Sequence, residues 1–143
     1  MIHNIKEWFK AAKPNPSTAD ACVQIGCHYE EVSEMSAVLN YDVEYMLAAT
    51  ALEYQMYYSG YLGAALEELS ADARVELLDA LCDQIVTAVG VAYMLGMDIE
   101  GALAEVNRSN WSKFKGGVVP VFNEHGKIVK GAEYTPPELS DYI

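Results

Sequence analysis

Acidic residues recur at helical spacing in two parts of the chain, and their carboxylates are the side chains best suited to chemistry. The first cluster is Glu30, Glu31 and Glu34. The second is Asp79 and Asp83, which are four residues apart and therefore stack on one face of a helix. Because hard divalent cations prefer such oxygen donors, the pattern predicts a Mg²⁺ site, for which Mn²⁺ is a substitute.

Each acidic cluster lies on a helical stripe that also carries apolar residues. At 3.6 residues per turn, the first stripe consists of Val23, Cys27, Glu31, Glu34 and Val38. The second stripe consists of Val75, Asp79, Asp83, Val86, Gly90 and Tyr93. We therefore expect the acids to point into a helical bundle, where ionised carboxylates are costly unless they are paired or bind a metal. The alternative is that both helices expose their acids to solvent.

Basic partners for these acids are scarce. The net charge is −12, and residues 14–106 contain 16 carboxylates but one basic residue, Arg74. This excess favours cation binding and lacks the broad basic face of a phosphate-backbone binder, so we expect no nucleic acid partner. Solubility is the simpler explanation of an acidic surface. A di-iron bundle is excluded because the chain has no Glu-x-x-His pair.

A third segment, residues 107–115, is dense in cationic and amide side chains where a helix is expected to end. Arg108, Asn110 and Lys113 are the residue types that donate hydrogen bonds to phosphate oxygens. We therefore predict that they bind the substrate. The alternative is that they cap the helix C-terminus.

Apolar periodicity and helix-breaking residues divide the chain into five helices and a C-terminal arm. The predicted helices cover 2–12, 17–39, 43–58 with a short piece to 69, 71–95 and 98–111, with a turn at 40–42. Two β-branched runs around a glycine turn predict a hairpin or an extended arm over 114–143. The fold class is thus all-α, a four- to five-helix bundle in a single domain spanning 1–143.

Composition also bears on the compartment. No apolar run reaches the roughly 18–20 residues that span a bilayer, so we expect no membrane partner. The N-terminal residues lack the apolar region of a signal peptide, which predicts a cytoplasmic protein. Cys22, Cys27 and Cys82 are interpreted as small buried side chains in a reducing compartment.

Three motifs in this order resemble the MazG-like all-α nucleoside triphosphate pyrophosphohydrolases, a superfamily that includes phosphoribosyl-ATP pyrophosphohydrolase and the dimeric dUTPases. Residues 24–34, QIGCHYEEVSE, are similar to its Glu-Glu-x-x-Glu helix, and residues 79–83, DALCD, to its second acidic helix. Residues 105–114, EVNRSNWSKF, are close to the Val-His-x-Ser-Asn-x-Ser-Lys signature of small phage and bacterial members. The ending at 131–139, GAEYTPPEL, also resembles theirs.

The chain departs from the family pattern at a few positions. Asn107 stands where histidine is common and Trp111 where methionine is common, which bears on the base or sugar pocket. The second acidic motif of the family is usually Glu-x-x-Asp, and Glu76 with Asp79 matches that pattern. Asp79 and Asp83 fit the distance to the downstream motif better, and they are the pair that we favour.

The resemblance implies a Mg²⁺-dependent enzyme that cleaves a nucleoside triphosphate to the monophosphate and pyrophosphate. The implied metal ligands are Glu31, Glu34, Asp79 and Asp83, with catalytic roles for Glu30 and Glu31 in orienting or deprotonating water. The implied substrate-binding residues are Arg108, Asn110 and Lys113. Members of the superfamily are dimers or tetramers, which implies a homodimer or homotetramer here.

Two other functions are compatible with the sequence. A phosphoribosyl-ATP-type pyrophosphohydrolase would keep the chemistry and change the substrate. A non-enzymatic acidic helical module that binds cations and oligomerises would need no segment like 107–113.

Overall fold

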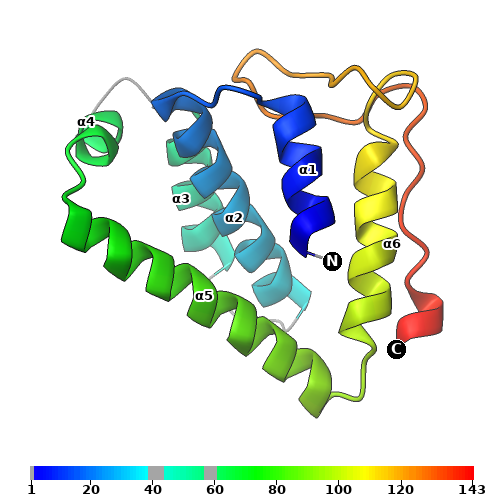
Figure 1. The fold of residues 1–143 in the computed structure, drawn as a ribbon. Coiled ribbons are helices and arrows are strands. Elements are labelled where there is room, and N and C mark those ends of the chain that lie inside the picture. Colours follow the sequence, from blue (N-terminus) through cyan, green and yellow to red (C-terminus); the bar gives the residue numbers. More distant parts are fainter. Residues whose placement is uncertain (1, 39–43, 57–60) are drawn as a thin grey trace. The chain divides into compact units, whose positions relative to one another are not determined.

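The computed structural model describes residues 2–38, 44–56 and 61–143, and within them the protein is all-α (Figure 1). Six α-helices are present, and no strand occurs in these ranges. The helices are α1 (Ile2–Ala12), α2 (Thr18–Val38), α3 (Glu44–Met56), α4 (Tyr61–Glu67), α5 (Ala71–Met94) and α6 (Ile99–Trp111), followed by a 3₁₀ turn at Ser140–Tyr142. The sequence predicted each of these helices to within about two residues, and the short piece is α4. The predicted turn at 40–42 lies outside the described residues.

The helix ends are determined by local side chains. Ser17, directly before α2, and Asp20, in its first turn, exchange hydrogen bonds between side chain and backbone, which is the arrangement of a capping box. Ser70 accepts a hydrogen bond from the Ala73 N–H at the start of α5, and Asp98 accepts one from the Gly101 N–H at the start of α6. Gly96 ends the α5 segment at a φ of 76°, which an L side chain rarely adopts.

The chain is divided into two compact units. Unit 1 comprises Met1–Pro14, Leu69–Val121 and Val129–Ile143, and unit 2 comprises Asn15–Glu68 and Phe122–Ile128. Each unit is described by itself below, and the single domain expected over 1–143 stays a prediction.

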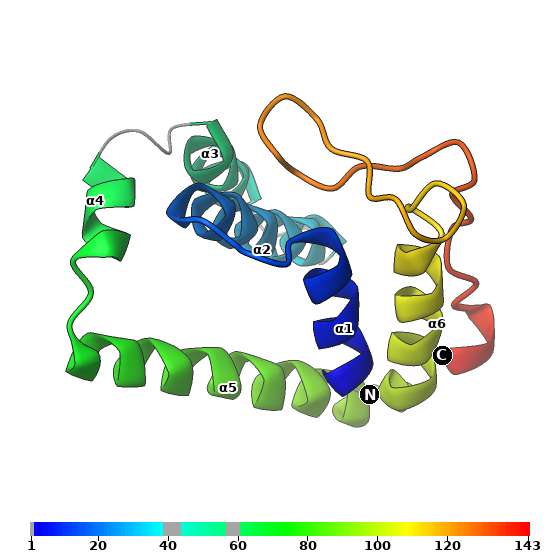
Figure 2. The ribbon, with the colours of Figure 1, turned by 45° about the horizontal axis from the view of Figure 1, so that its top comes forward.

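Unit 2 is built on the close packing of α2 against α3, which lie side by side in Figures 1 and 2. Gly26 makes this approach possible, because a Cβ atom there would lie 2.7 Å from the Ala51 carbonyl oxygen. Cys22 and Val23 on α2 and Ala51 on α3 are buried. The burial predicted for cysteine is confirmed for Cys22.

Unit 1 is held by contacts of α1 with α6 and of the C-terminal tail with α6 (Figure 1). Its most buried large side chain is Phe114, which is 1% exposed and stacks on Trp8 with ring centroids 5.6 Å apart. Trp111 packs edge-on against the same ring at 5.4 Å. Cys82, on α5, is exposed, so the prediction that it is buried is wrong for the single chain.

No strand forms in the described C-terminal arm, but the two predicted runs pair across the glycine turn, with Val129 N–H donating to the Val121 carbonyl oxygen at 2.8 Å. Two isolated antiparallel bridges, Lys115 with Val119 and Phe122 with Ile128, are the only β pairing in the described ranges. Pro120 lies between them and has no N–H to donate to a ladder, which explains why no strand develops. By length and apolar content, no single described helix is suited to crossing a membrane; α5 and α6 pass that test only as a pair bent by 118°.

Candidate functional site

The acidic cluster of α2 lies on a regular helix, as predicted, but it does not point inward. Glu31 and Glu34 are exposed and Glu30 is half-buried, although the neighbouring Ser33 and Ser36 are buried. The expectation that these acids face the interior is therefore wrong for the single chain. The reason is visible in the packing, since α3 covers the side of α2 that carries the small residues Cys22, Gly26 and Ser33.

Glu30 is the exception on this helix, because two donors hold one of its carboxylate oxygens. Gln55 on α3 donates from Nε2 to Glu30 Oε2 at 3.0 Å, and the Lys127 ammonium donates to the same oxygen. Both residues of the ion pair are partly shielded, with Lys127 28% and Glu30 39% exposed in their side chains. All three residues belong to unit 2.

The pKa values of this pair move in the directions that keep both groups charged. Partial burial by itself raises the pKa of Glu30, but the hydrogen bonds from Lys127 and Gln55 outweigh it, so the pKa lies below the usual value. Burial by itself lowers the pKa of Lys127, but the hydrogen bond to Glu30 and the nearby Glu31 carboxylate raise it overall. At neutral pH Glu30 is therefore ionised, and its positive partner is a residue of its own chain.

No sequence pattern indicated this ion pair, because its members are 97 residues apart. Lys127 is presented by a tight turn in which Asn123 Oδ1 accepts hydrogen bonds from the His125 and Lys127 N–H groups, each at 3.0 Å. An asparagine that stabilises a turn in this way is recognisable in the sequence. That this turn brings Lys127 to Glu30 depends on the tertiary fold.

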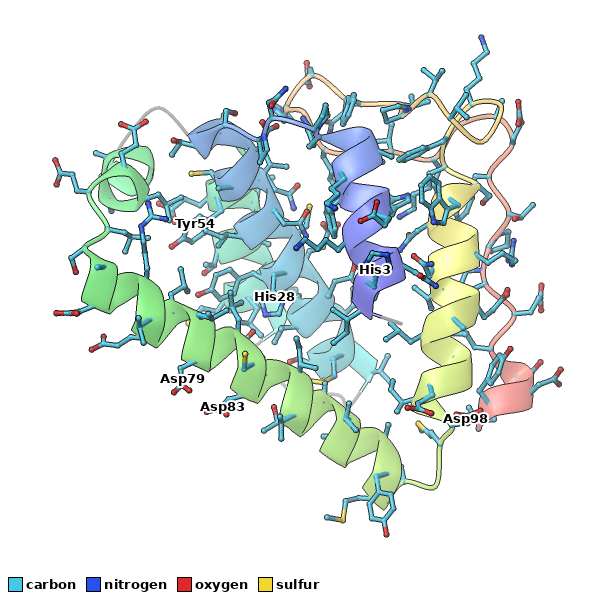
Figure 3. The ribbon with its side chains drawn as sticks, in the orientation of Figure 1. His3, His28, Tyr54, Asp79, Asp83 and Asp98 are labelled. Carbon is cyan, nitrogen blue, oxygen red and sulfur yellow. The ribbon has the colours of Figure 1, made fainter. Side chains whose placement is uncertain are left out.

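The second acidic pair lies on α5 in unit 1, where Asp79 and Asp83 project from one side of the helix (Figure 3). Both are exposed. At 100° per residue, Asp72 and Glu76 fall on this same side, and the side across the helix carries Leu81 and Ile85, with Arg74 near its start. As on α2, the expected inward orientation is wrong for the single chain.

The segment predicted to bind phosphate lies at the C-terminal end of α6. Arg108 donates four hydrogen bonds, two to the Glu105 carboxylate, one to Thr135 Oγ1 and one to the Pro136 carbonyl oxygen. Since guanidinium has five N–H donors, most of its donor capacity is used in fastening the C-terminal tail to α6. Substrate binding by Arg108 stays a prediction. The contacts of Arg108 show a structural role, which is to hold the C-terminal tail on α6.

Glu105, Ser109 and Ser112 complete this attachment of the tail. Glu105 accepts from the Glu138 N–H at 2.9 Å, and the Arg108 and Glu138 donors lower the pKa of its carboxyl group to about 2. Ser109, which is 2% exposed, donates from Oγ to the Thr135 carbonyl oxygen at 2.9 Å. The Thr135 N–H in turn donates to Ser112 Oγ at 2.8 Å. The serines of the motif therefore fix the tail.

The other two predicted substrate-binding residues adjoin the aromatic cluster of Trp8, Trp111 and Phe114. The Lys113 ammonium lies 5.8 Å from the centroid of the Trp8 ring, within the range of a cation–π contact. The Asn110 carbonyl oxygen accepts a hydrogen bond from Trp8 Nε1 at 2.9 Å. The structure thus brings Asn110 and Lys113 together beside Trp8, a partner that the sequence motif did not indicate.

The donor types on α2 suit a hard divalent cation. In the part of the chain that the structure describes, no three His, Cys, Asp or Glu side chains gather into a group that could hold a metal ion. Mg²⁺ does not require such a group, because it commonly keeps several waters and uses one or two carboxylates together with substrate phosphates. The α2 face also binds a positive group already, the Lys127 ammonium on Glu30. The donor types on α2 therefore suit Mg²⁺, while the described residues form no ligand group around it.

Comparison with protein-family models, with curated proteins and with solved structures gives no match to this chain.

Proposed function

We propose that this protein is a Mg²⁺-dependent nucleoside triphosphate pyrophosphohydrolase that releases a nucleoside monophosphate and pyrophosphate. The observation that carries the proposal is the order of three motifs along an all-α chain. The acidic cluster of α2 comes first, the aspartate pair of α5 second and the segment at the end of α6 third. This order, with the donor chemistry of the two acidic helices, supports cleavage of a phosphoanhydride.

In this proposal the metal ligands are Glu31 and Glu34 from α2 with Asp79 and Asp83 from α5. Bound Mg²⁺ would supply charge neutralisation of the phosphates and a lowered pKa of its water. Either Glu30 or Glu31, whichever is not fully committed to metal, would orient or deprotonate the attacking water; the contact with Lys127 lowers the pKa of Glu30 and so weakens it as a base.

Substrate binding is assigned to three residues at the end of α6. Lys113, whose ammonium is partly exposed beside Trp8, contacts phosphate oxygens. Asn110 contacts phosphate or sugar oxygens next to it. Arg108 contributes less to substrate binding, because Glu105 and the tail accept hydrogen bonds from most of its donors.

The test is an assay of the purified chain with Mg²⁺ against the common ribo- and deoxyribonucleoside triphosphates, with monophosphate and pyrophosphate both quantified. Glu34→Gln and Asp83→Asn are expected to lower turnover by at least about 100-fold with unchanged helix content by circular dichroism. Matched controls are Glu53→Gln and Asp72→Asn, which remove equally exposed acids of α3 and α5. Unchanged turnover in both ligand variants would refute the ligand assignment. Phosphoribosyl-ATP belongs in the same panel, since it distinguishes the related activity.

We also propose that the active species is a homo-oligomer in which α5 packs against α5 of a second copy. Ten large apolar side chains of α5 are exposed: Val75, Leu77, Leu78, Leu81, Ile85, Val86, Val89, Val91, Tyr93 and Met94. They are distributed around the helix, and five of them lie together on the side across from Asp79 and Asp83: Leu77, Leu78, Leu81, Ile85 and Val89. A helix this apolar is normally buried.

The charge pattern of α5 favours a second copy in antiparallel orientation. Its charged residues all lie in 72–83, and residues 84–94 carry none. An antiparallel pair sets the acidic half of one helix beside the uncharged half of the other, so like charges do not face one another. In a parallel pair the acidic halves of the two helices would lie at the same end, and their like charges would repel one another.

The oligomer is tested by light scattering after size exclusion. Leu81→Glu and Ile85→Glu, on the apolar side of α5, should give a monomer. Ala80→Glu, exposed on another side of the same helix, should not. A wild-type monomer at micromolar concentration would refute the assembly and leave the α5 face to be covered within one chain.

The same apolar face favours one other function, that of a non-enzymatic module that oligomerises. An oligomer that cleaves no nucleotide of the panel would support it over the enzyme.

A further inference from the structure

Three lysines of unit 1 lie on two segments of the C-terminal arm that run side by side. Lys113 and Lys115 belong to the first segment and Lys130 to the second, and we call the three the arm lysines. The two backbones are in close contact, because a Cβ atom on Gly131 would lie 2.8 Å from the Lys113 carbonyl oxygen. The fold therefore gathers positive side chains that are separated in the sequence.

The arm lysines keep their charge free of carboxylates, although the chain carries 21 acidic residues and 9 basic ones. In the part of the chain that the structure describes, none of the three forms an ion pair, whereas Lys10, Arg108 and Lys127 each do. In so acidic a chain, a group of lysines without acidic partners is a surface that attracts external anions.

Aromatic rings hold two of the arm lysines without taking up all of their hydrogen-bond donors. Lys113 Nζ lies 5.8 Å from the centroid of the Trp8 ring, and Lys130 Nζ lies 4.9 Å from that of the Tyr134 ring. An ammonium has three N–H donors, and those that point away from the ring can still meet an oxygen acceptor. Both ammonium groups are therefore placed by the protein and remain able to bind an anion.

The turn that follows Lys115 already binds an anionic oxygen. The Gly116 N–H donates to Glu133 Oε2 at 3.1 Å. Gly116 and Gly117 are exposed, with φ values of 61° and 71°, and they present no side chain that would block a ligand. Glu133 is the one acidic residue of segments 113–121 and 129–134. An external anion would therefore meet three positive groups and one negative group.

We propose that the arm lysines form a binding site for an oligophosphate, the chemical group of pyrophosphate and of the triphosphate end of a nucleotide. A chain of phosphates suits ammonium groups that are spread along two segments, because it offers several charged oxygens over its length. The site lies within unit 1 and needs no metal ligand. It shares Lys113 with the substrate-binding segment, so the assignment of the anion to the substrate rests on the proposed function.

The first measurement is calorimetric titration of the full chain with inorganic tripolyphosphate after divalent ions have been removed. Lys115→Met and Lys130→Met, both at exposed positions, should each lower the affinity about three- to fivefold. Lys115→Arg and Lys130→Arg keep the charge and should stay within about twofold of wild type. Inorganic phosphate, with fewer charges, should bind at least about tenfold more weakly.

Two further variants control for charge. Lys6→Met removes an equal charge from an exposed position of α1 in the same unit. Lys6 is two residues before Trp8 and therefore lies on nearly the opposite side of the helix from the ring that holds Lys113, so the affinity should not change. Glu133→Gln removes the one negative group and should raise the affinity about twofold.

The second measurement locates the bound anion through the rate at which each lysine is acylated, determined by mass spectrometry. A bound anion covers the amines and stabilises their protonated form, so saturating tripolyphosphate should slow acylation of the arm lysines at least about threefold. The rate at Lys6 should stay constant.

The outcomes separate this site from the proposed function. Absence of tripolyphosphate binding at millimolar concentration, or equal affinity in wild type and both methionine variants without protection from acylation, overturns the site and leaves nucleotide cleavage to its own assay. Equal affinity for inorganic phosphate overturns the oligophosphate class. Weaker binding in the methionine variants of a chain that cleaves no nucleotide supports the site and overturns its assignment to a substrate. If the chain is active, the same variants should raise KM for the nucleotide and leave kcat unchanged.

Discussion

Replacing Phe114 by alanine tests whether the aromatic cluster is the core of unit 1. Its side chain is 1% exposed, stacked on Trp8 with an interplanar angle of 26° and met edge-on by Trp111 at 65°. Removing a fully buried phenylalanine costs about 3–5 kcal/mol, which includes the loss of two aromatic contacts of about 1 kcal/mol each. We expect about 4 kcal/mol, a large part of the stability of a small domain.

Urea unfolding followed by tryptophan fluorescence measures this change directly. Trp8 and Trp111 are the two tryptophans of the chain, and both touch Phe114. The signal therefore reports unit 1, whereas circular dichroism reports all helices. Val118→Ala is a control in the same unit, where a side chain that is 72% exposed should cost less than about 0.5 kcal/mol. If Phe114→Ala lowers the unfolding free energy by less than about 1 kcal/mol, the cluster is not the core of this unit.

Three further predictions concern the tail and the helix packing. The folded pKa of Glu105, about 2, lies below the ordinary 4.5, so its contribution to holding the tail is complete above pH 4.5 and disappears as the pH falls toward 2. Proteolysis of residues 135–139 should rise across that window, and Glu105→Gln should remove the pH dependence. Gly26→Ala should destabilise unit 2 by about 1–3 kcal/mol in circular dichroism, because its Cβ would lie 2.7 Å from the Ala51 carbonyl oxygen. Gly90→Ala, which meets nothing within 4 Å, should instead stabilise α5 by about 0.5–1 kcal/mol, and a destabilisation would mean that another surface covers it.

The helices were predictable because the capping residues and the apolar spacing that define them act within a few residues. Ser70 and Asp98 cap α5 and α6, and each side chain accepts a hydrogen bond from the N–H three residues along the chain. Such contacts form wherever the segment is helical, whatever surrounds it. The two acidic clusters are local in the same sense, since spacing alone places each of them on one side of a helix.

The direction in which those helices face was not predictable from the stripes. The α2 stripe mixes carboxylates with apolar residues, and the small side chains beside it, such as Gly26, are what pack against α3. Close helix packing selects the side with the least bulk, so Glu31 and Glu34 are left exposed. Periodicity gives the angle between residues around a helix, and it does not give the side that a neighbour covers.

The all-α class, the helix bounds and the grouping of acids on α2 and α5 follow from the amino-acid pattern, because each depends on residues within one or two turns. The attachment of the tail by Arg108, through Thr135 at a separation of 27 residues, and the neutralisation of Glu30 by Lys127 depend on how the chain folds. Contacts over such separations form when packing closes long loops of chain, and no local spacing encodes which pairs will meet.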